Sequence, residues 1–183
     1  MRIFALLFIA SSTFSLAAQA PATLPTIDPL ASLDFLLGTW SAKTNATAGS
    51  AGAQVAGAYT FHRDLGGHAL ARTSSEDICK GPKDFDCAHH DQLTIFVNPN
   101  DGLLSALYLD SEGHVIHYAI TMPAPHTAIF LSQSAPSQHM PVFRLMYHLE
   151  GDGPQAIMSG KFQMAAPGSD DFHSYLEWSG TRQ

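Results

Sequence analysis

Histidine is the residue type with the most potential chemistry in this sequence, with ten copies among 183 residues. Imidazole nitrogens bind zinc and copper and exchange protons near neutral pH. The densest group of metal-ligating types is Cys87, His89 and His90, with Asp91 next in the chain. Adjacent side chains of an extended segment point in opposite directions, so His89 and His90 cannot reach one ion without a bend. We therefore assign no metal site from the sequence, and keep His89, His90 and His173 as the candidates for one.

The sequence contains none of the short motifs that mark common catalytic sites. It has no Gly-x-Ser-x-Gly elbow, no His-Glu-x-x-His helix, no phosphate-binding glycine loop and no dinucleotide fingerprint. Its paired acids, at 76–77 and 170–171, fall in turns or at strand ends, where a solvated charge is the simplest interpretation. Catalytic groups can assemble from distant positions, so enzymatic activity stays open. The sequence favours a protein that is not an enzyme, and no catalytic residue is assigned.

The first twenty residues predict export from the cytoplasm. A charged start at Arg2 is followed by an apolar run over 3–10 and by small residues at Ala18 and Ala20, which is the pattern of a secretory signal peptide over 1–20. The apolar run is far shorter than the roughly 20 residues needed to span a bilayer. We therefore expect no membrane anchor, and a mature protein in the periplasm or outside the cell.

Cys79 and Cys87 are the two cysteines, and they frame the polar segment 80–86. In an oxidising compartment, two close thiols in a loop rich in turn residues usually pair. We therefore predict a disulfide between Cys79 and Cys87 that holds this loop.

Composition limits the size of the fold and the class of its partners. The formal net charge of −7 repels a phosphate backbone, which argues against nucleic acid as a partner. Hydrophobic residues make up 45% of the chain and charged residues 14%, which is typical of a folded protein. We expect an extended lead-in over 21–29 and a single domain over 30–183. The sequence does not indicate an oligomeric state.

Alternation of apolar and polar residues dominates the chain after one short helix. Leucines at three- and four-residue spacing over 28–37 predict that helix. Turn residues then separate ten strand-like segments. The predicted strands cover residues 39–44, 58–64, 68–76, 91–97, 103–109, 114–122, 127–132, 142–149, 156–164 and 174–179. Because each strand has one apolar face to cover, we predict a mostly-β fold, an antiparallel up-and-down β-barrel of about ten strands preceded by one short helix.

Residues 33–40 carry a family resemblance. They read LDFLLGTW, and the pattern Leu-x-Phe-Leu-x-Gly-x-Trp resembles the entry to the first strand of calycin-type barrels, notably the nitrobindin-like group and related lipocalin-like secreted bacterial families of unknown function. The resemblance implies a glycine turn from the helix into the first strand and a tryptophan, here Trp40, buried at the closed end of the barrel. It also implies an arginine near the last strand that packs over this tryptophan, for which Arg182 is the candidate.

Haem is the cofactor that the resemblance suggests. Nitrobindin-like proteins bind haem through a histidine near the end of the chain, and His173 is closest to that position here. Alternation places His173 opposite the apolar set of Phe172, Leu176 and Trp178, which predicts an imidazole that faces solvent. Axial ligation needs an inward imidazole in an apolar pocket. We therefore assign no cofactor, and keep a haem- or metal-dependent enzyme as the alternative function.

A binding module is the function that the sequence favours. Barrels of this size hold either packed side chains or one small ligand. We expect a small apolar or amphipathic ligand inside the barrel. The residues expected to line its site are Trp40, Tyr59, Phe61, Phe96, Tyr108, Phe143, Tyr147, Phe162 and Met164. A solid core, with function in surface contacts, is the structural alternative.

Overall fold

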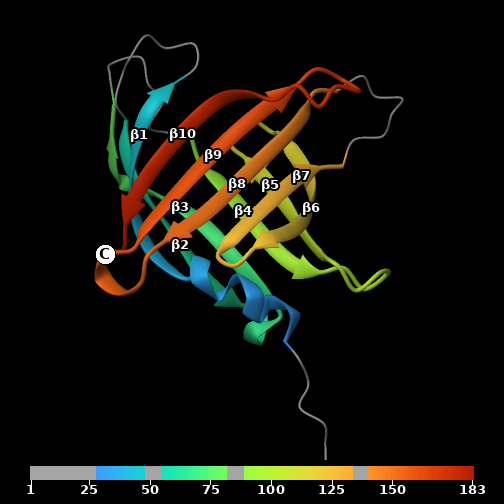
Figure 1. Ribbon diagram of the computed structural model, residues 1–183, viewed down its shortest axis with the longest axis horizontal. Helices are drawn as coiled ribbons and strands as arrows, with labels where there is room; N and C mark the ends of the chain where they lie inside the picture. Colours follow the sequence, from blue (N-terminus) through green and yellow to red (C-terminus); the bar gives the residue numbers. More distant parts are fainter. Residues whose placement is uncertain (1–27, 48–54, 82–88, 134–139) are drawn as a thin grey trace, which may run out of the picture.

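Ten antiparallel strands close into one barrel (Figure 1). The computed structural model describes residues 28–47, 55–81, 89–133 and 140–183. The strands are β1 (Gly38–Thr47), β2 (Ala56–Asp64), β3 (Ala69–Lys80), β4 (Asp91–Val97), β5 (Leu104–Asp110), β6 (Val115–Ala124), β7 (Thr127–Ser132), β8 (Val142–Glu150), β9 (Ile157–Ala165) and β10 (His173–Thr181). Short 3-10 segments form η1 (Pro29–Leu36), η2 (Leu65–Gly67) and η4 (Gly153–Gln155).

The predicted meander is confirmed strand by strand. Each of the ten predicted segments forms a strand, with differences confined to the strand ends. Every strand pairs with its neighbours along the chain, and β1 also pairs with β10 through Lys43 opposite Ser179 and Thr44 opposite Trp178. This pairing removes the two open edges that a flat sheet would leave.

The helix η1 covers one end of the barrel. It begins after Asp28, whose carboxylate accepts a hydrogen bond from the N–H of Leu30 at 2.9 Å. The helix has 3-10 geometry, with three residues per turn, so side chains three apart lie above one another. Leu30, Leu33 and Leu36 have this spacing, and each is at most 2% exposed. The tighter winding therefore aims all three leucines into the barrel.

Trp40 and Arg182 close the same end. Trp40 is fully buried, and its indole N–H donates to the carbonyl of Leu36 at 2.8 Å. The guanidinium of Arg182 lies 4.6 Å from the centroid of the Trp40 ring, which confirms the pairing that the family resemblance implied. Gly38 joins η1 to β1 with a φ of +114°, and a Cβ there would lie 3.2 Å from Nη1 of Arg182. Both the backbone conformation and this close approach therefore favour glycine.

Tyr147 stands at the centre of the interior. Its ring contacts those of Tyr59, Phe61, Phe130 and Trp178, at centroid distances of 6.1, 5.3, 5.9 and 5.9 Å. Most of these contacts are edge-to-face, the geometry that aromatic pairs favour. Side chains therefore fill the middle of the barrel.

Two glycines let β9 and β10 pass close to their neighbours. A Cβ at Gly160 would lie 2.1 Å from Cε2 of Trp178, so the indole occupies the space that a side chain on β9 would fill. A Cβ at Gly180 would lie 1.4 Å from the carbonyl oxygen of Ser41. The closure of the barrel between β10 and β1 therefore depends on the missing side chain at Gly180.

The end opposite η1 is the mouth of the barrel, where β3, β5, β7 and β9 finish and β4, β6, β8 and β10 begin. Segments 48–54, 82–88 and 134–139, which connect strands at this end, lie outside the described residues. Cys79 is half-buried near the end of β3, whereas Cys87 falls in the second of these segments, so the predicted disulfide stays a prediction.

The predicted signal peptide over 1–20 and the part of the lead-in before Asp28 also lie outside the described residues. Within the described ranges, no helix has the length and apolar character needed to cross a membrane.

Candidate functional site

The half of the interior nearest the mouth has two chemically different walls. The polar wall, on β3, β4 and β5, consists of Arg72, Ser74, Asp91, Tyr108 and Asp110. The apolar wall, on β6 and β8 to β10, consists of Ile116, Phe143, Phe162, Met164 and Leu176. Each of these ten residues is partly buried, whereas the residues in the middle of the barrel are almost completely buried. A polar wall that faces an apolar wall suits an amphipathic ligand.

Arg72 organises the polar wall. Its Nη2 lies 3.0 Å from Oδ2 of Asp91, and the two side chains are 13% and 12% exposed. The hydroxyl of Ser74 also donates to Asp91. Burial alone would lower the pKa of Arg72, but interactions with Tyr147, Asp91 and other nearby groups raise the pKa above its usual value. The guanidinium is therefore charged at any physiological pH.

Two buried polar atoms in the described part of the chain have no hydrogen-bond partner. They are Nε of Arg72 and the hydroxyl of Tyr147. Both side chains project into the interior, Arg72 from the polar wall and Tyr147 from the centre of the barrel. A buried polar atom without a partner costs about 1–3 kcal/mol. Such atoms therefore mark a place where a guest molecule or water would be stabilised.

The phenols of the interior are neutral hydrogen-bonding groups. Burial raises the pKa of Tyr59 to about 12, and burial also raises the pKa of Tyr108, Tyr118 and Tyr147 above the usual value. The ring of Tyr59 also lies 5.5 Å from the Arg72 guanidinium carbon. The interior thus offers one fixed positive charge, an acidic partner and several neutral hydroxyls.

The predicted lining residues divide into three groups. Trp40, Tyr59, Phe61 and Tyr147 are at most 4% exposed and belong to the packed core. Nearer the mouth, the partly buried residues are Tyr108, Phe143, Phe162 and Met164. Phe96 is adjacent to the fully buried Ile95 on β4, so its side chain lies on the outer face of the barrel and not in the interior.

Sequence reasoning did not assign a binding role to Arg72, Ser74 or Asp91. The signal that could have found them is parity: Arg72 alternates with the buried Leu70, and Asp91 alternates with the buried Leu93. A charged residue on the apolar parity of a strand points inward, and two on neighbouring strands can form an interior ion pair.

A second group of chemical interest lies on the rim of the mouth. His89 lies between two carboxylates, with Nε2 4.0 Å from Oδ2 of Asp110 and Nδ1 3.5 Å from Oε1 of Glu112. His114 Nδ1 lies 2.8 Å from the same Asp110 oxygen and 3.6 Å from Oε2 of Glu112. Asp110 itself is only 4% exposed. The three metal candidates from the sequence are not brought together, since His89 joins this group without His90 or His173.

His173 does not meet the requirement for haem ligation. Its side chain is 80% exposed and lies 3.5 Å from the equally exposed Asp171. The prediction that it faces solvent is confirmed, but the reason differs from simple alternation. A bulge between Ser174 and Leu176 shifts the register of β10, so His173 pairs with Met164 and shares the face of this inward residue, against the expectation from alternation. Its exposure comes from its place at the first residue of β10, where the imidazole lacks the apolar surroundings that axial ligation needs.

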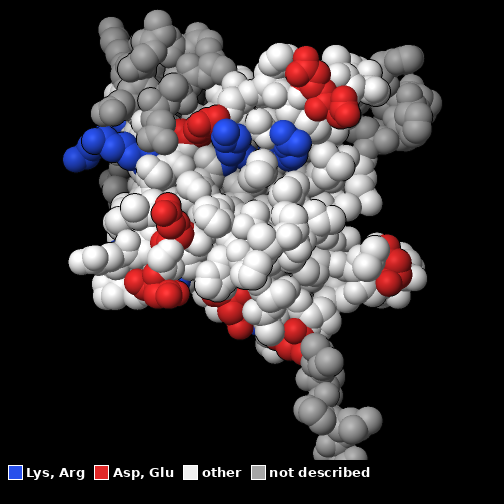
Figure 2. Space-filling model, viewed as in Figure 1, with Lys and Arg blue, Asp and Glu red and all other residues white. Residues whose placement is uncertain are grey.

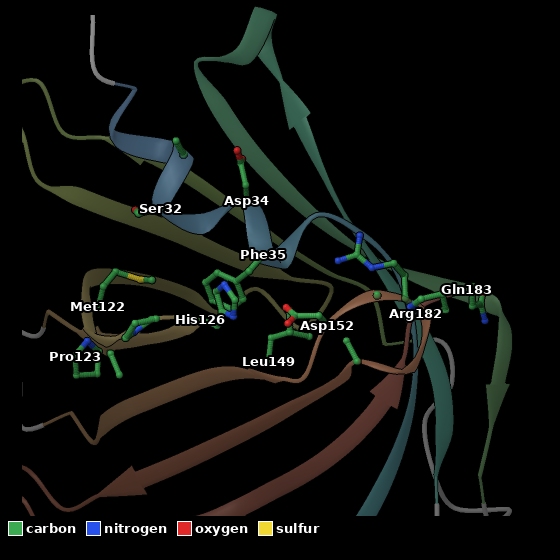
Figure 3. A pocket seen from close by; sticks show the side chains of 16 residues that line it. Ser32, Asp34, Phe35, Met122, Pro123, His126, Leu149, Asp152, Arg182 and Gln183 are labelled. Carbon is green, nitrogen blue, oxygen red and sulfur yellow. The ribbon is translucent and has the colours of Figure 1, made fainter.

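A groove lies on the outside of the barrel, at the closed end (Figure 3). It has a volume of about 1210 Å³ and lies between η1, the β6–β7 and β8–β9 connections and the C-terminal residues. Phe35 and His126 stack across it at a centroid distance of 5.7 Å. Two of its charged residues already have structural partners: Asp34 binds Arg63 at 2.5 Å, and Arg182 covers Trp40. Because neither unpaired buried atom lies there, the mouth is the stronger candidate.

Surface charge is sparse on the face seen in Figure 2, where uncharged residues cover most of the visible area. On β9 and β10, Lys161 pairs with Glu177 at 2.8 Å. This face has no broad basic patch of the kind that binds a phosphate backbone.

Ten antiparallel strands closed around a packed interior, with one end covered by a short helix, define a calycin-like β-barrel. The crystal structure of Rv2717c from M. tuberculosis is similar, with a TM-score of 0.56 and 16% sequence identity over 86% of this chain and 98% of that chain. The similarity shows that the two proteins share the calycin-like barrel fold.

A de novo designed fluorescence-activating β-barrel matches less well. Its TM-score is 0.28 and its identity 15%, over 86% of this chain and 100% of that chain. No family model and no curated protein matches the sequence.

Proposed function

We propose that this protein is an exported β-barrel that binds one small amphipathic molecule in the half of its interior nearest the mouth. The unpaired Arg72 Nε and Tyr147 hydroxyl are the observation that carries the proposal. A barrel that served only as a solid scaffold would gain stability from apolar groups at these two positions. A ligand that binds both atoms would explain their polarity.

The two walls limit the chemistry of the ligand. Arg72 Nε is a donor, so the ligand must present an acceptor such as a carbonyl, sulfonyl or phosphoryl oxygen. The Tyr147 hydroxyl can donate to the same acceptor or accept from a neighbouring group. The apolar wall, with Phe143 and Phe162 stacked at 5.8 Å, suits an aromatic or aliphatic body. We therefore expect a compact molecule with an apolar body and one oxygen-rich end.

A fluorescence titration with 1-anilinonaphthalene-8-sulfonate tests this proposal, because the dye has an aromatic body and a sulfonate acceptor. We expect saturable one-to-one binding to the wild type, with affinity reduced about five- to tenfold in Tyr147→Phe, which loses a hydrogen bond worth about 1 kcal/mol or more. Tyr175→Phe is the matched control: Tyr175 is 51% exposed near the start of β10, and the change removes only its hydroxyl while its ring contact with Phe162 of the apolar wall remains. Absence of saturable binding, or equal losses in the two variants, would contradict a site in the interior.

Export and the disulfide form one further part of the proposal. It is supported by the signal-peptide pattern over 1–20 and by the two closely spaced cysteines. Intact-mass measurement of the exported protein, before and after alkylation without reduction, checks both: we expect a chain that starts after Ala20 and takes up no alkylating reagent. Uptake at both thiols would show that the pair is reduced.

The Cys79→Ser, Cys87→Ser double variant tests what the bond contributes. A short loop closed by a disulfide contributes about 2–3 kcal/mol, so we expect the variant to fold with a lower melting temperature. We also expect faster protease cleavage within residues 80–86. A variant that does not fold at all would mean that the bond has a larger role than holding one loop.

A further inference from the structure

We infer that His89, Asp110 and Glu112 form a binding site for a divalent transition-metal ion, of the zinc type, on the rim of the barrel. One potential ligand atom from each of the three residues lies within 4.8 Å of the others. An imidazole with two carboxylates is a donor set that suits zinc, cobalt, nickel and manganese. The sequence alone does not predict this combination, because the partners of His89 come from β5 and the turn after it and not from its neighbours in the chain.

The ligand atoms lie somewhat farther apart than a bound ion requires. A tetrahedral ion with bonds of about 2.0–2.1 Å holds neighbouring ligand atoms roughly 3.3 Å apart. The two short distances of His89 involve opposite ring nitrogens, with Nδ1 3.5 Å from Glu112 and Nε2 4.0 Å from Asp110, and one ion can use only one of these nitrogens. One atom from each of the three residues lies within 4.8 Å of the others. The half-exposed His89 ring and the exposed Glu112 carboxylate must therefore rotate to bring the set to bonding distances.

Asp110 is held in position by hydrogen bonds to Oδ1, the carboxylate oxygen that does not face His89. Oδ1 accepts from the backbone N–H groups of Glu112 at 3.0 Å and His114 at 2.9 Å. The second oxygen, Oδ2, faces His114 Nδ1 at 2.8 Å and the Tyr108 hydroxyl at 3.3 Å. Hydrogen bonds of this kind orient ligands in metal sites and raise their affinity. The buried carboxylate is thus fixed before an ion arrives.

Three protein ligands leave at least one coordination position free. The nearest polar group of the interior is Tyr108, whose hydroxyl lies 3.4 Å from His89 Nε2 and whose ring belongs to the polar wall. The free position would therefore sit at the entrance to the proposed ligand site. The metal site does not depend on that proposal, because neither the Arg72 Nε nor the Tyr147 hydroxyl takes part in it.

Simple charge pairing is the competing explanation, in which protonated His89 and His114 only neutralise the two carboxylates. It predicts no preference for a transition metal. The two explanations are separated by binding measured at pH 7.5, using mature protein without a polyhistidine tag and stripped with a chelator. Co²⁺ reports coordination directly, because four- and five-coordinate sites with nitrogen ligands absorb more strongly in the visible range than hydrated Co²⁺.

We expect one Co²⁺ per chain, displaced by Zn²⁺, and a rise in melting temperature with Zn²⁺ concentration. His89→Gln and Glu112→Gln should each weaken Co²⁺ binding about tenfold or more, with no loss of folding, because both side chains are on the rim. His173→Gln is the matched control: it also removes a rim histidine beside a carboxylate, here Asp171 at 3.5 Å, but one without a third ligand.

Three results would overturn the inference. They are a wild type that does not saturate with Co²⁺, a wild type whose Co²⁺ spectrum equals that of the free ion, and a His173→Gln variant that weakens binding as much as His89→Gln. The last result would assign the ion to exposed histidines in general. Any of these outcomes leaves the dye-binding test of the interior unaffected, so the two proposals can fail separately.

Discussion

At the scale of single residues, Tyr147 has a buried hydroxyl with no hydrogen-bond partner among the described residues. Tyr147→Phe removes this oxygen and keeps the four ring contacts. We expect the free energy of unfolding to stay the same or rise by up to about 1–3 kcal/mol, because a buried unpaired hydroxyl is unfavourable. Urea denaturation of the ligand-free protein measures this change. A loss of more than about 1 kcal/mol would mean that the hydroxyl has a stabilising partner.

The Arg72–Asp91 pair should behave in the opposite way. Arg72→Met leaves a largely buried carboxylate without its partner, and we expect a loss of about 3–5 kcal/mol in stability. The double variant Arg72→Met, Asp91→Leu should recover much of that loss, since both buried charges are then gone. Chemical denaturation of the three proteins gives the coupling energy.

Lys161→Met provides the control for that experiment. Lys161 and Glu177 form an ion pair at 2.8 Å, slightly shorter than the 3.0 Å of Arg72 and Asp91, but their side chains are 42% and 37% exposed. Exposed pairs contribute about 0–1 kcal/mol, so this variant should be nearly neutral. If Arg72→Met were as mild as Lys161→Met, the interior pair would be better solvated than its burial indicates.

At the scale of elements, the pattern of apolar residues was enough to predict all ten strands but not the details of their ends. Alternation along β8 shows which side chains face in, because every second residue of a half-buried strand must be apolar. The bulge in β10 could not be predicted, since it depends on how that strand pairs with β9. The group of His89, Asp110 and Glu112 on the rim could not be predicted either, because His89 and Asp110 come close only through the register between β4 and β5.

Gly160 is the element-scale position with the clearest test. Gly160→Ala would place a Cβ 2.1 Å from the Trp178 ring, in a barrel wall that cannot move without breaking its hydrogen bonds. We expect a loss of about 1–3 kcal/mol or more from overpacking, together with a changed tryptophan fluorescence spectrum. Gly57→Ala on β2 is the control, because no atom lies within 4 Å of a Cβ built there. Similar losses in both variants would point to a backbone effect and not to the indole.

At the scale of the whole molecule, the barrel depends on its last strand. β10 pairs with both β1 and β9, and residues 173–183 also supply Trp178 to the core and Arg182 to the closed end. Deletion of residues 173–183 should therefore give a protein with little tertiary structure and a tendency to associate through two exposed edges. Near-ultraviolet circular dichroism and size-exclusion chromatography check this result.

A synthetic peptide covering residues 170–183 is the matching rescue experiment. If β10 acts by filling the gap between β1 and β9, the added peptide should restore the near-ultraviolet spectrum. A truncated protein that is already monomeric and folded would show that nine strands can close without it.

The pairing of β1 with β10 also sets the order of events during biosynthesis. A ribosome makes β1 early and β10 late, so the first strand has no partner on one side while most of the protein is being translated. Contacts between such distant parts of a chain form slowly, on a timescale of about milliseconds to seconds for β-rich domains. The newborn polypeptide is therefore held open for a long interval, accessible to chaperones and to any machinery that threads unfolded chains, and the barrel closes only after that interval.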